Sequence, residues 1–220
     1  MTKLTAADGH SFDAYEVRPD DAASAIVVIQ EIFGVNEHIR SVVDRYATFG
    51  YHAIAPALFD RVKPGVELDY DQDGMTQGRA MAGEIKWDPA MLDLAATVAH
   101  VTATGPVGAV GYCFGGSLAW LCAEELPVAA AVGYYGGQIH SLNDRDPAAP
   151  IMLHFGELDG GIPLDQVDEI TKAHPDVDVY VYEGAQHGFS CDARGSFHPL
   201  SAAIALGRTL DFFVSHGVKP

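Results

Sequence analysis

Val107-Gly-Ala-Val-Gly-Tyr-Cys-Phe-Gly-Gly-Ser117 is the stretch that decides the fold of this chain. It opens with a short apolar run typical of a buried strand, and Ser117 to Ala123 continues as an apolar helical stretch. Between them, Gly111-Tyr-Cys-Phe-Gly115 has the form Gly-x-nucleophile-x-Gly, with cysteine where serine is more usual. A nucleophile on a sharp strand-to-helix turn brings the backbone so close that only glycine fits beside it. The context therefore predicts a nucleophile elbow and covalent acyl chemistry through the Cys113 thiolate.

The rest of the chain alternates strand-like and helix-like patterns. Helical stripes run from Ile39 to Phe49, from Asp88-Pro89 to Val101 and from Pro199 to Val214. The order predicts an α/β fold with a mostly parallel, doubly wound sheet and helices on both faces, plus an antiparallel hairpin at Leu4 to Val17. Apolar, β-rich runs predict buried strands at 25–29, 52–55, 107–110, 129–134, 151–155 and 177–182.

Length and charge limit the possible partners. With 220 residues and 48% hydrophobic content, we expect residues 1–220 to form a single domain. No apolar run approaches the ~20 residues of a membrane span, and the start of the chain does not resemble a signal peptide, so we expect a cytoplasmic protein without a membrane partner. The net charge of −17 argues against nucleic acid. We expect a small-molecule substrate and a monomer or weak homodimer.

The three cysteines Cys113, Cys122 and Cys191 fit neither a disulfide framework nor a zinc spacing. We therefore expect free thiols, no metal and no cofactor. Cys122 lies in the helix after the elbow and is interpreted as a small core residue. The role of Cys191 stays open.

A cysteine nucleophile needs a base and an acid that orients the base. Asp159 directly follows the strand predicted at 151–155, and His187 follows the strand predicted at 177–182, where parallel sheets place their chemistry. Thirty acidic residues and ten histidines make any single one unremarkable. The order Cys113, Asp159, His187 after successive strands nevertheless matches the α/β-hydrolase order and favours a catalytic triad. Glu157 is the main rival for the acid.

Two backbone amides are candidates for the oxyanion hole. Phe114 follows the nucleophile, and Ile32 follows the strand predicted at 25–29. Glu31 at the same strand end is a carboxylate that burial would penalise unless it is paired or poised for chemistry, and one interpretation is a direct contact with the Cys113 thiol.

The segment from Arg61 to Lys86 is polar, rich in Asp and Gly, and has no clear period. We predict a long connection. A substrate-facing lid and a solvated surface excursion are both open interpretations.

Four motifs together resemble the dienelactone hydrolase family over nearly the whole chain: Gln30-Glu-Ile-Phe-Gly-Val-Asn36, Gly111-Tyr-Cys-Phe-Gly-Gly116, Val132-Gly-Tyr-Tyr-Gly136 and Gly184-Ala-Gln-His-Gly-Phe189. The resemblance implies an α/β-hydrolase fold and a Cys-His-Asp triad that converts dienelactone to maleylacetate in the breakdown of chlorinated aromatic compounds. It also implies that Glu31 holds the resting thiol until substrate arrives.

The chain departs from the family where the substrate carboxylate would bind. In well-known members an arginine stands four residues after the catalytic histidine, and here that position is Cys191. Arg194 and Arg79 are the remaining candidates for the carboxylate. The residue after His187 is Gly188 in place of a small hydroxyl residue.

These observations predict a hydrolase that opens the enol-lactone ring of dienelactone (carboxymethylenebutenolide). The alternative enzyme is a broader carboxylesterase with the same triad. Two other classes stay open: a thiol-redox protein, although Cys-x-x-Cys is missing, and a catalytically silent small-molecule binder.

Overall fold

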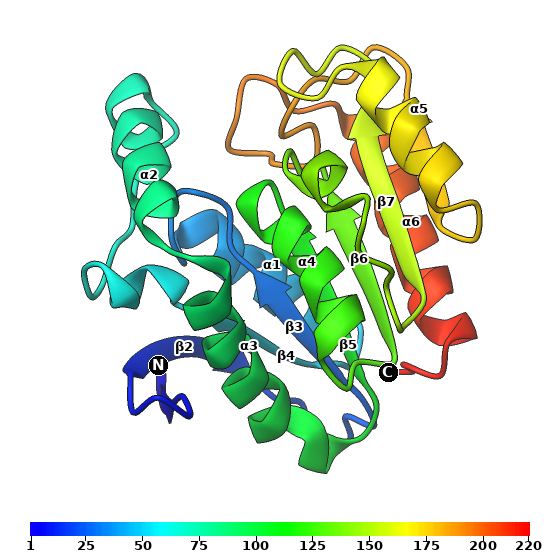
Figure 1. Ribbon diagram of the computed structural model, residues 1–220. Coiled ribbons are helices and arrows are strands. Elements are labelled where there is room, and N and C mark those ends of the chain that lie inside the picture. The colour runs from blue at the N-terminus through cyan, green and yellow to red at the C-terminus, as the bar shows by residue number, and fades with distance from the viewer.

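The computed structural model describes residues 1–220, and one eight-stranded sheet runs through its centre (Figure 1). The strand order is β1-β2-β4-β3-β5-β6-β7-β8. The strands from β4 to β8 in this order are parallel, and β1 and β2 add an antiparallel hairpin at one edge. The predicted sheet and hairpin are confirmed, but the strand predicted as buried at 177–182 is an edge strand in which only Tyr182 is buried. The strands are β1 (Thr2–Thr5), β2 (Ser11–Val17), β3 (Ala25–Ile29), β4 (His52–Pro56), β5 (Val107–Tyr112), β6 (Ala130–Tyr134), β7 (Ile151–Gly156) and β8 (Asp178–Tyr182).

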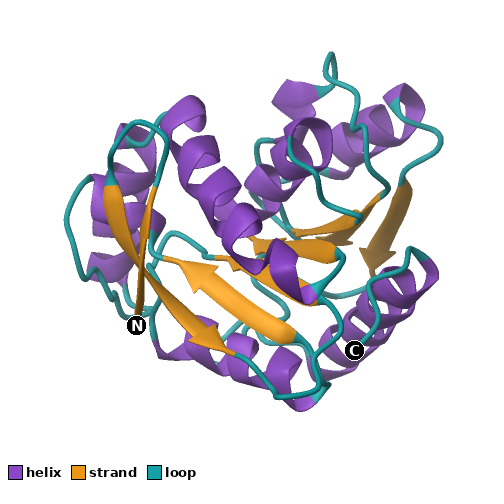
Figure 2. Ribbon diagram, turned by 90° about the horizontal axis from the view of Figure 1, so that it is seen from below, coloured by secondary structure: helices purple, strands orange, loops and turns teal.

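Helices cover both faces of the sheet (Figure 2). Helices α3 and α4 pack together on one face, and α1 and α6 lie on the other. None of the helices combines the length and the apolar character that a membrane crossing requires. The helices are α1 (Glu37–Thr48), α2 (Gln72–Glu84), α3 (Trp87–Val101), α4 (Phe114–Glu125), α5 (Leu164–Ala173) and α6 (Pro199–Ser215).

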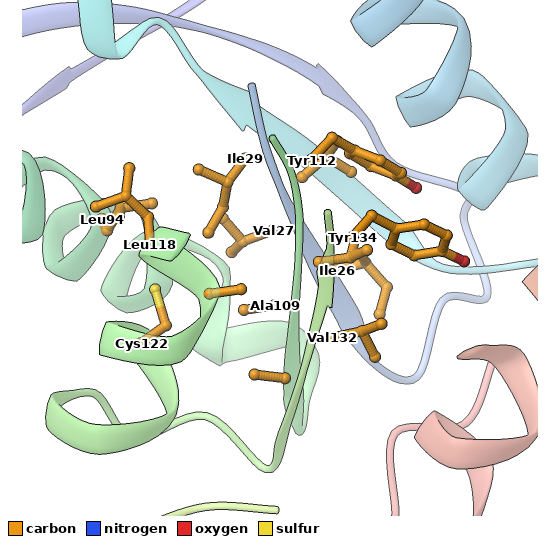
Figure 3. Packing of buried hydrophobic residues seen from close by; sticks show 14 of the residues in the cluster. Ile26, Val27, Ile29, Leu94, Ala109, Tyr112, Leu118, Cys122, Val132 and Tyr134 are labelled. Atoms are coloured by element: carbon orange, nitrogen blue, oxygen red, sulfur yellow. The ribbon is translucent and has the colours of Figure 1, made fainter. Parts of the chain in front are cut away.

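Alternating side chains of the central strands build a core on each side of the sheet (Figure 3). Val27 and Ala109 point towards Leu118 of α4, whereas Tyr112 and Tyr134 point to the opposite face. Alternation of this kind is the consequence of the two-residue repeat of a strand. Cys122 is fully buried beside Leu118, which confirms its assignment as a core residue.

The connection predicted at 61–86 contains helix α2, so the prediction of an irregular segment there is wrong. Asp71 caps this helix by accepting a hydrogen bond from the Gly74 amide at 2.7 Å. Only glycines of α2 are buried, and a Cβ on Gly78 would collide with the Ile32 carbonyl. The helix thus packs on the Ile32 turn through its glycine backbone. Because no large apolar side chains are needed for this contact, the sequence of the helix shows no apolar stripe.

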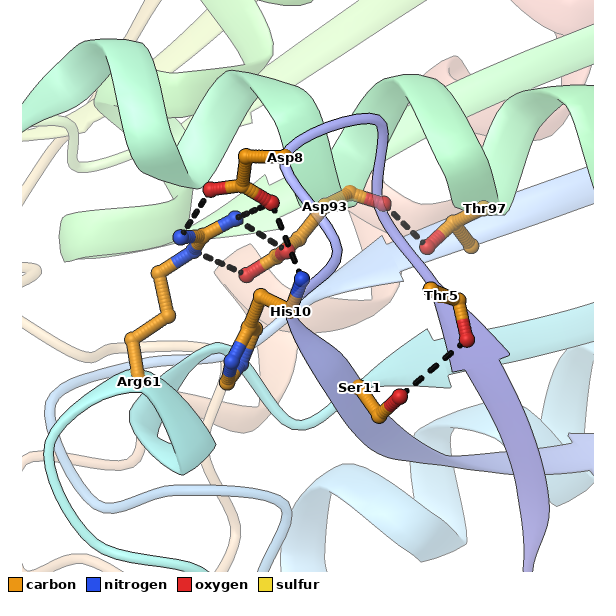
Figure 4. A network of polar contacts seen from close by, with 7 residues as sticks. All are labelled: Thr5, Asp8, His10, Ser11, Arg61, Asp93 and Thr97. Carbon is orange, nitrogen blue, oxygen red and sulfur yellow. Dashed lines mark hydrogen bonds and ion pairs between the residues drawn. The ribbon is translucent and has the colours of Figure 1, made fainter.

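Arg61 fastens the start of this segment to the hairpin and to α3 (Figure 4). Its guanidinium makes two 2.7 Å hydrogen bonds to the buried carboxylate of Asp93 and a 2.8 Å contact with Asp8. Burial raises the pKa of Asp93, and the arginine opposes that rise. A bidentate pair of this kind fixes both position and orientation, so the segment leaves the sheet in a defined direction.

Candidate active site

Cys113 occupies a strained turn between β5 and α4. Its φ of 55° and ψ of −111° are unusual for a residue with a side chain. A Cβ on Gly111 would collide with the Gly115 carbonyl, and one on Gly115 would collide with the Ile29 carbonyl. The turn is held by the Cys113 amide, which donates to the Tyr134 carbonyl at 3.0 Å. This backbone presents the thiol at the carboxyl ends of the parallel strands, as the sequence predicts.

The structure brings Cys113, His187 and Asp159 together. The Nε2 atom of His187 lies 3.1 Å from the Cys113 sulfur, and its Nδ1 atom lies 2.7 Å from Oδ2 of Asp159. The other carboxylate oxygen of Asp159 accepts the Gly161 amide at 2.8 Å. Each group is therefore oriented by the next, in the geometry that general-base activation of a nucleophile needs.

The charge state of His187 follows from two opposing influences. Burial lowers its pKa, but the hydrogen bonds to Asp159 and Cys113 outweigh burial and raise the pKa to about 10. The imidazole is consequently protonated at neutral pH.

Glu157, the rival acid, faces elsewhere. Its Oε2 atom accepts the Gly184 amide at 2.8 Å, and the residue is exposed. Asp159 is the carboxylate that meets the histidine.

The two predicted oxyanion donors line the same cavity as the thiol. This cavity of about 250 Å³ is bordered by Ile32, Cys113, Phe114 and Arg79. The Ile32 amide makes no hydrogen bond within the protein. Phe114 is the first residue of α4, so its amide has no acceptor inside the helix. Both donors are free to bind a developing negative charge.

Glu31 does not hold the thiol as expected. The thiol contacts His187, whereas Oε2 of Glu31 accepts a 2.8 Å hydrogen bond from the Tyr70 hydroxyl. Its Oε1 atom lies 3.7 Å from Nη1 of Arg194. Glu31 is fully buried, and the Tyr70 hydroxyl satisfies only Oε2, because Arg194 lies too far from Oε1 for a hydrogen bond. The phenol remains a donor because burial, and then the charge of Glu31, raise the pKa of Tyr70.

Both candidate arginines border the site. Arg79 on α2 lines the cavity with Cys113 and a second cavity of about 310 Å³ that includes His187 and Arg194. A Cβ on Gly188 would stand 2.6 Å from Nη1 of Arg194. The departure from the family at Gly188 thus makes room for the guanidinium of Arg194.

Sequence reasoning assigned no role to four residues around the site. Tyr135, directly after β6, has a φ of 39° and places its ring 5.0 Å from that of His187. Its position at a strand end was the available signal. Tyr70 gave none, because it lies in the segment without a period. His38 and Cys191 form with Glu31 a buried group that has donor atoms suited to a metal ion.

Comparisons with known proteins show which proteins this chain is similar to. The family model described as "Dienelactone hydrolase family" matches residues 12–217. The carboxymethylenebutenolidase of Pseudomonas putida is 35% identical, with 93% of this chain and 92% of that protein covered. The same values hold for the carboxymethylenebutenolidase of Pseudomonas knackmussii. A crystal structure from Klebsiella pneumoniae, provisionally named a dienelactone hydrolase, has a TM-score of 0.81 and 29% identity over 96% of this chain and 97% of that one.

Proposed function

The chain belongs to the dienelactone hydrolase family and is a hydrolase of ester or lactone bonds, and from this premise we propose that it opens the enol-lactone ring of dienelactone (carboxymethylenebutenolide) to maleylacetate. Cys113 is the nucleophile, His187 the base and Asp159 the residue that orients the base. The 3.1 Å and 2.7 Å contacts of His187 support these roles.

In the first half of the reaction the Cys113 thiolate attacks the lactone carbonyl carbon. The amides of Ile32 and Phe114 bind the oxyanion of the tetrahedral intermediate. The intermediate collapses by breaking the ring carbon–oxygen bond, which forms a thioester and releases an enolate that stays attached to it. The His187 imidazolium supplies the proton that this leaving group takes up.

In the second half, water hydrolyses the thioester. Neutral His187 removes a proton from the water as it attacks the acyl carbon, and the thiolate leaves to restore the enzyme. The sum is addition of one water to the lactone, and the enol rearranges to the ketone of maleylacetate. The 30% exposure of the His187 side chain supports the access of water to the base.

The observation that carries the choice of substrate is the pair of arginines at the cleft. A net charge of −17 repels an anionic lactone unless a local cation binds its carboxylate. Arg79 borders the cavity of the thiol, and Arg194 with Arg79 borders the adjoining cavity of His187. These two side chains are therefore the proposed carboxylate ligands.

Steady-state kinetics on dienelactone and on a neutral aryl ester test the proposal. In Arg194→Gln and Arg79→Gln we expect kcat/KM for the lactone to fall by about 10- to 100-fold, the usual worth of a hydrogen bond to a charged group. The same variants should change ester turnover by less than about three-fold, because the ester carries no carboxylate. Good ester turnover by the unaltered enzyme without lactone turnover would reject the lactone assignment and keep the triad.

One observation favours the alternative of a broader carboxylesterase. Arg194 stands near Glu31 and over the rings of Phe33 and Tyr70, at 5.7 and 5.9 Å from their centroids. An arginine engaged in this way is less available to a substrate. The paired kinetics above separate the two candidates.

A further inference from the structure

A second group of nucleophilic and acid-base side chains lies outside the proposed triad. Glu31, His38 and Cys191 are all buried, and one ligand atom of each lies within 4.8 Å of those of the other two. They come from the end of β3, the first turn of α1 and the loop before α6. The proposed triad leaves His38 and Cys191 without a role.

The imidazole of His38 is oriented like a metal ligand. Its Nδ1 atom lies 2.9 Å from a carboxylate oxygen of Asp192. Because a carboxylate oxygen only accepts, Nδ1 donates in this contact, and in the neutral imidazole the lone pair is then on Nε2. The Nε2 atom is buried and has no hydrogen-bond partner. Histidines that bind metals commonly donate their other N–H to a carboxylate in this way.

The carboxylate of Glu31 also has one unused oxygen. Tyr70 donates to Oε2, while Oε1 is buried and without a hydrogen-bond partner. Arg194 neutralises part of its charge, but the 3.7 Å separation is too long for a hydrogen bond. Two buried polar atoms without partners in one cluster are costly, which indicates that something else satisfies them.

The thiol of Cys191 completes a mixed donor set. This side chain is fully buried, and a divalent ion would bind it as the thiolate and displace its proton. One sulfur, one imidazole nitrogen and one carboxylate oxygen are donors typical of zinc.

We propose that Glu31, His38 and Cys191 form a Zn²⁺ site that is separate from the catalytic thiol. Ligand atoms around tetrahedral zinc lie roughly 3.4 Å apart, so side-chain shifts of little more than about an ångström close the site. Two negative ligands balance the charge of the ion. A water from the adjoining cavity, bordered by His38, Tyr70 and Asp192, supplies the fourth ligand and the entry path. The proposal stands independently of the lactone substrate and replaces the expectation of no metal.

Cobalt titration of the full chain tests the site directly. Cys113→Ser is the background, because it removes the one partly exposed thiol as a competing ligand. After dialysis against a chelator, we expect Co²⁺ to bind with a stoichiometry of one and to give the near-ultraviolet charge-transfer band of a thiolate ligand, and Zn²⁺ to displace it. Adding Cys191→Ser should abolish the band, and adding His38→Gln should weaken binding by at least about ten-fold.

The matched control is Cys122→Ser, since Cys122 is a buried thiol that belongs to no group of side chains with metal-binding spacing. Its band should equal that of the background. Circular dichroism establishes that each variant is folded. A band that persists without Cys191, or no band in the folded background protein, overturns the proposal.

Anomalous diffraction at the zinc edge, on crystals of the unaltered protein grown with Zn²⁺, gives a test that needs no variant. A peak between the three side chains supports the site. A peak only at Cys113 and His187, peaks only at surface carboxylates, or no peak overturns it.

Discussion

The molecule contains two groups with the same residue types and different surroundings. In the first, Cys113, His187 and Asp159 form an unbroken chain of contacts at 3.1 and 2.7 Å. In the second, Nδ1 of His38 lies 2.9 Å from Asp192, but its Nε2 atom has no hydrogen-bond partner, although Cys191 is near. A cysteine, a histidine and an aspartate close together therefore do not always form a chain of contacts. Sulfur and imidazole touch in the first group and not in the second.

The two thiols also differ in the charge of the side chain that faces them. Cys113 faces an imidazolium, because the pKa of His187 is raised to about 10. Cys191 faces the carboxylate of Glu31, which together with burial raises its pKa to about 12. A neighbouring positive charge favours a thiolate and a neighbouring negative charge opposes it. The charges that face the two thiols therefore have opposite signs.

The largest test of the comparison removes the carboxylate from the first group. In Asp159→Asn we expect kcat to fall by roughly 10³- to 10⁴-fold, because the amide no longer stabilises the imidazolium or its tautomer. Steady-state kinetics on any ester that the unaltered enzyme hydrolyses measures the loss of kcat. Glu157→Gln is the matched control, two residues away with its carboxylate on the Gly184 amide, and should stay within about three-fold of the unaltered enzyme. Equal losses in the two variants would contradict the assignment of the acid.

A smaller contrast is expected in thiol alkylation. At pH 7.5 iodoacetamide should modify Cys113 about a thousand-fold faster than Cys191, since burial and a high pKa both suppress the second thiolate. Mass spectrometry of peptides from timed samples gives both rates in one experiment, with fully buried Cys122 as an internal reference. If Cys191 reacts as fast as Cys113, its environment is not the one described here.

The first group was predictable from the sequence because its members stand at the ends of strands. Cys113, Asp159 and His187 each follow an apolar run, and parallel strands bring their carboxyl ends to one edge. The glycines around Cys113 also indicated a tight turn, because residues with a side chain would not fit there. The same reasoning supplied the candidates Ile32 and Phe114 for the oxyanion hole.

The second group was not predictable by the same means. His38 lies inside α1 and Cys191 in a loop, so no fixed spacing joins them to Glu31. The expected contact of Glu31 with the thiol was wrong because Glu31 pairs with Tyr70. Tyr70 could not be found from the sequence, since it lies just before α2, a helix without an apolar stripe. Long-range side-chain pairing of this kind depends on tertiary packing, which hydrophobic periodicity and motif spacing in the sequence do not reveal.

The smallest expected effect is a pH dependence that belongs to the first group alone. Because the folded pKa of His187, about 10, exceeds the ordinary 6.5, its proton stabilises the folded state fully below pH 6.5, less as the pH rises, and not above pH 10. Urea unfolding measures the difference in unfolding free energy between the unaltered protein and His187→Gln. After allowance for solvent screening, we expect this advantage to be on the order of 1 kcal/mol and to shrink between pH 6.5 and 10. In an Asp159→Asn background this pH dependence should weaken. Burial lowers the pKa of His187, and the hydrogen bond to Asp159 that opposes burial is then lost. An advantage that grows with pH would mean that His187 is held neutral, and the charge contrast between the two thiols would fail.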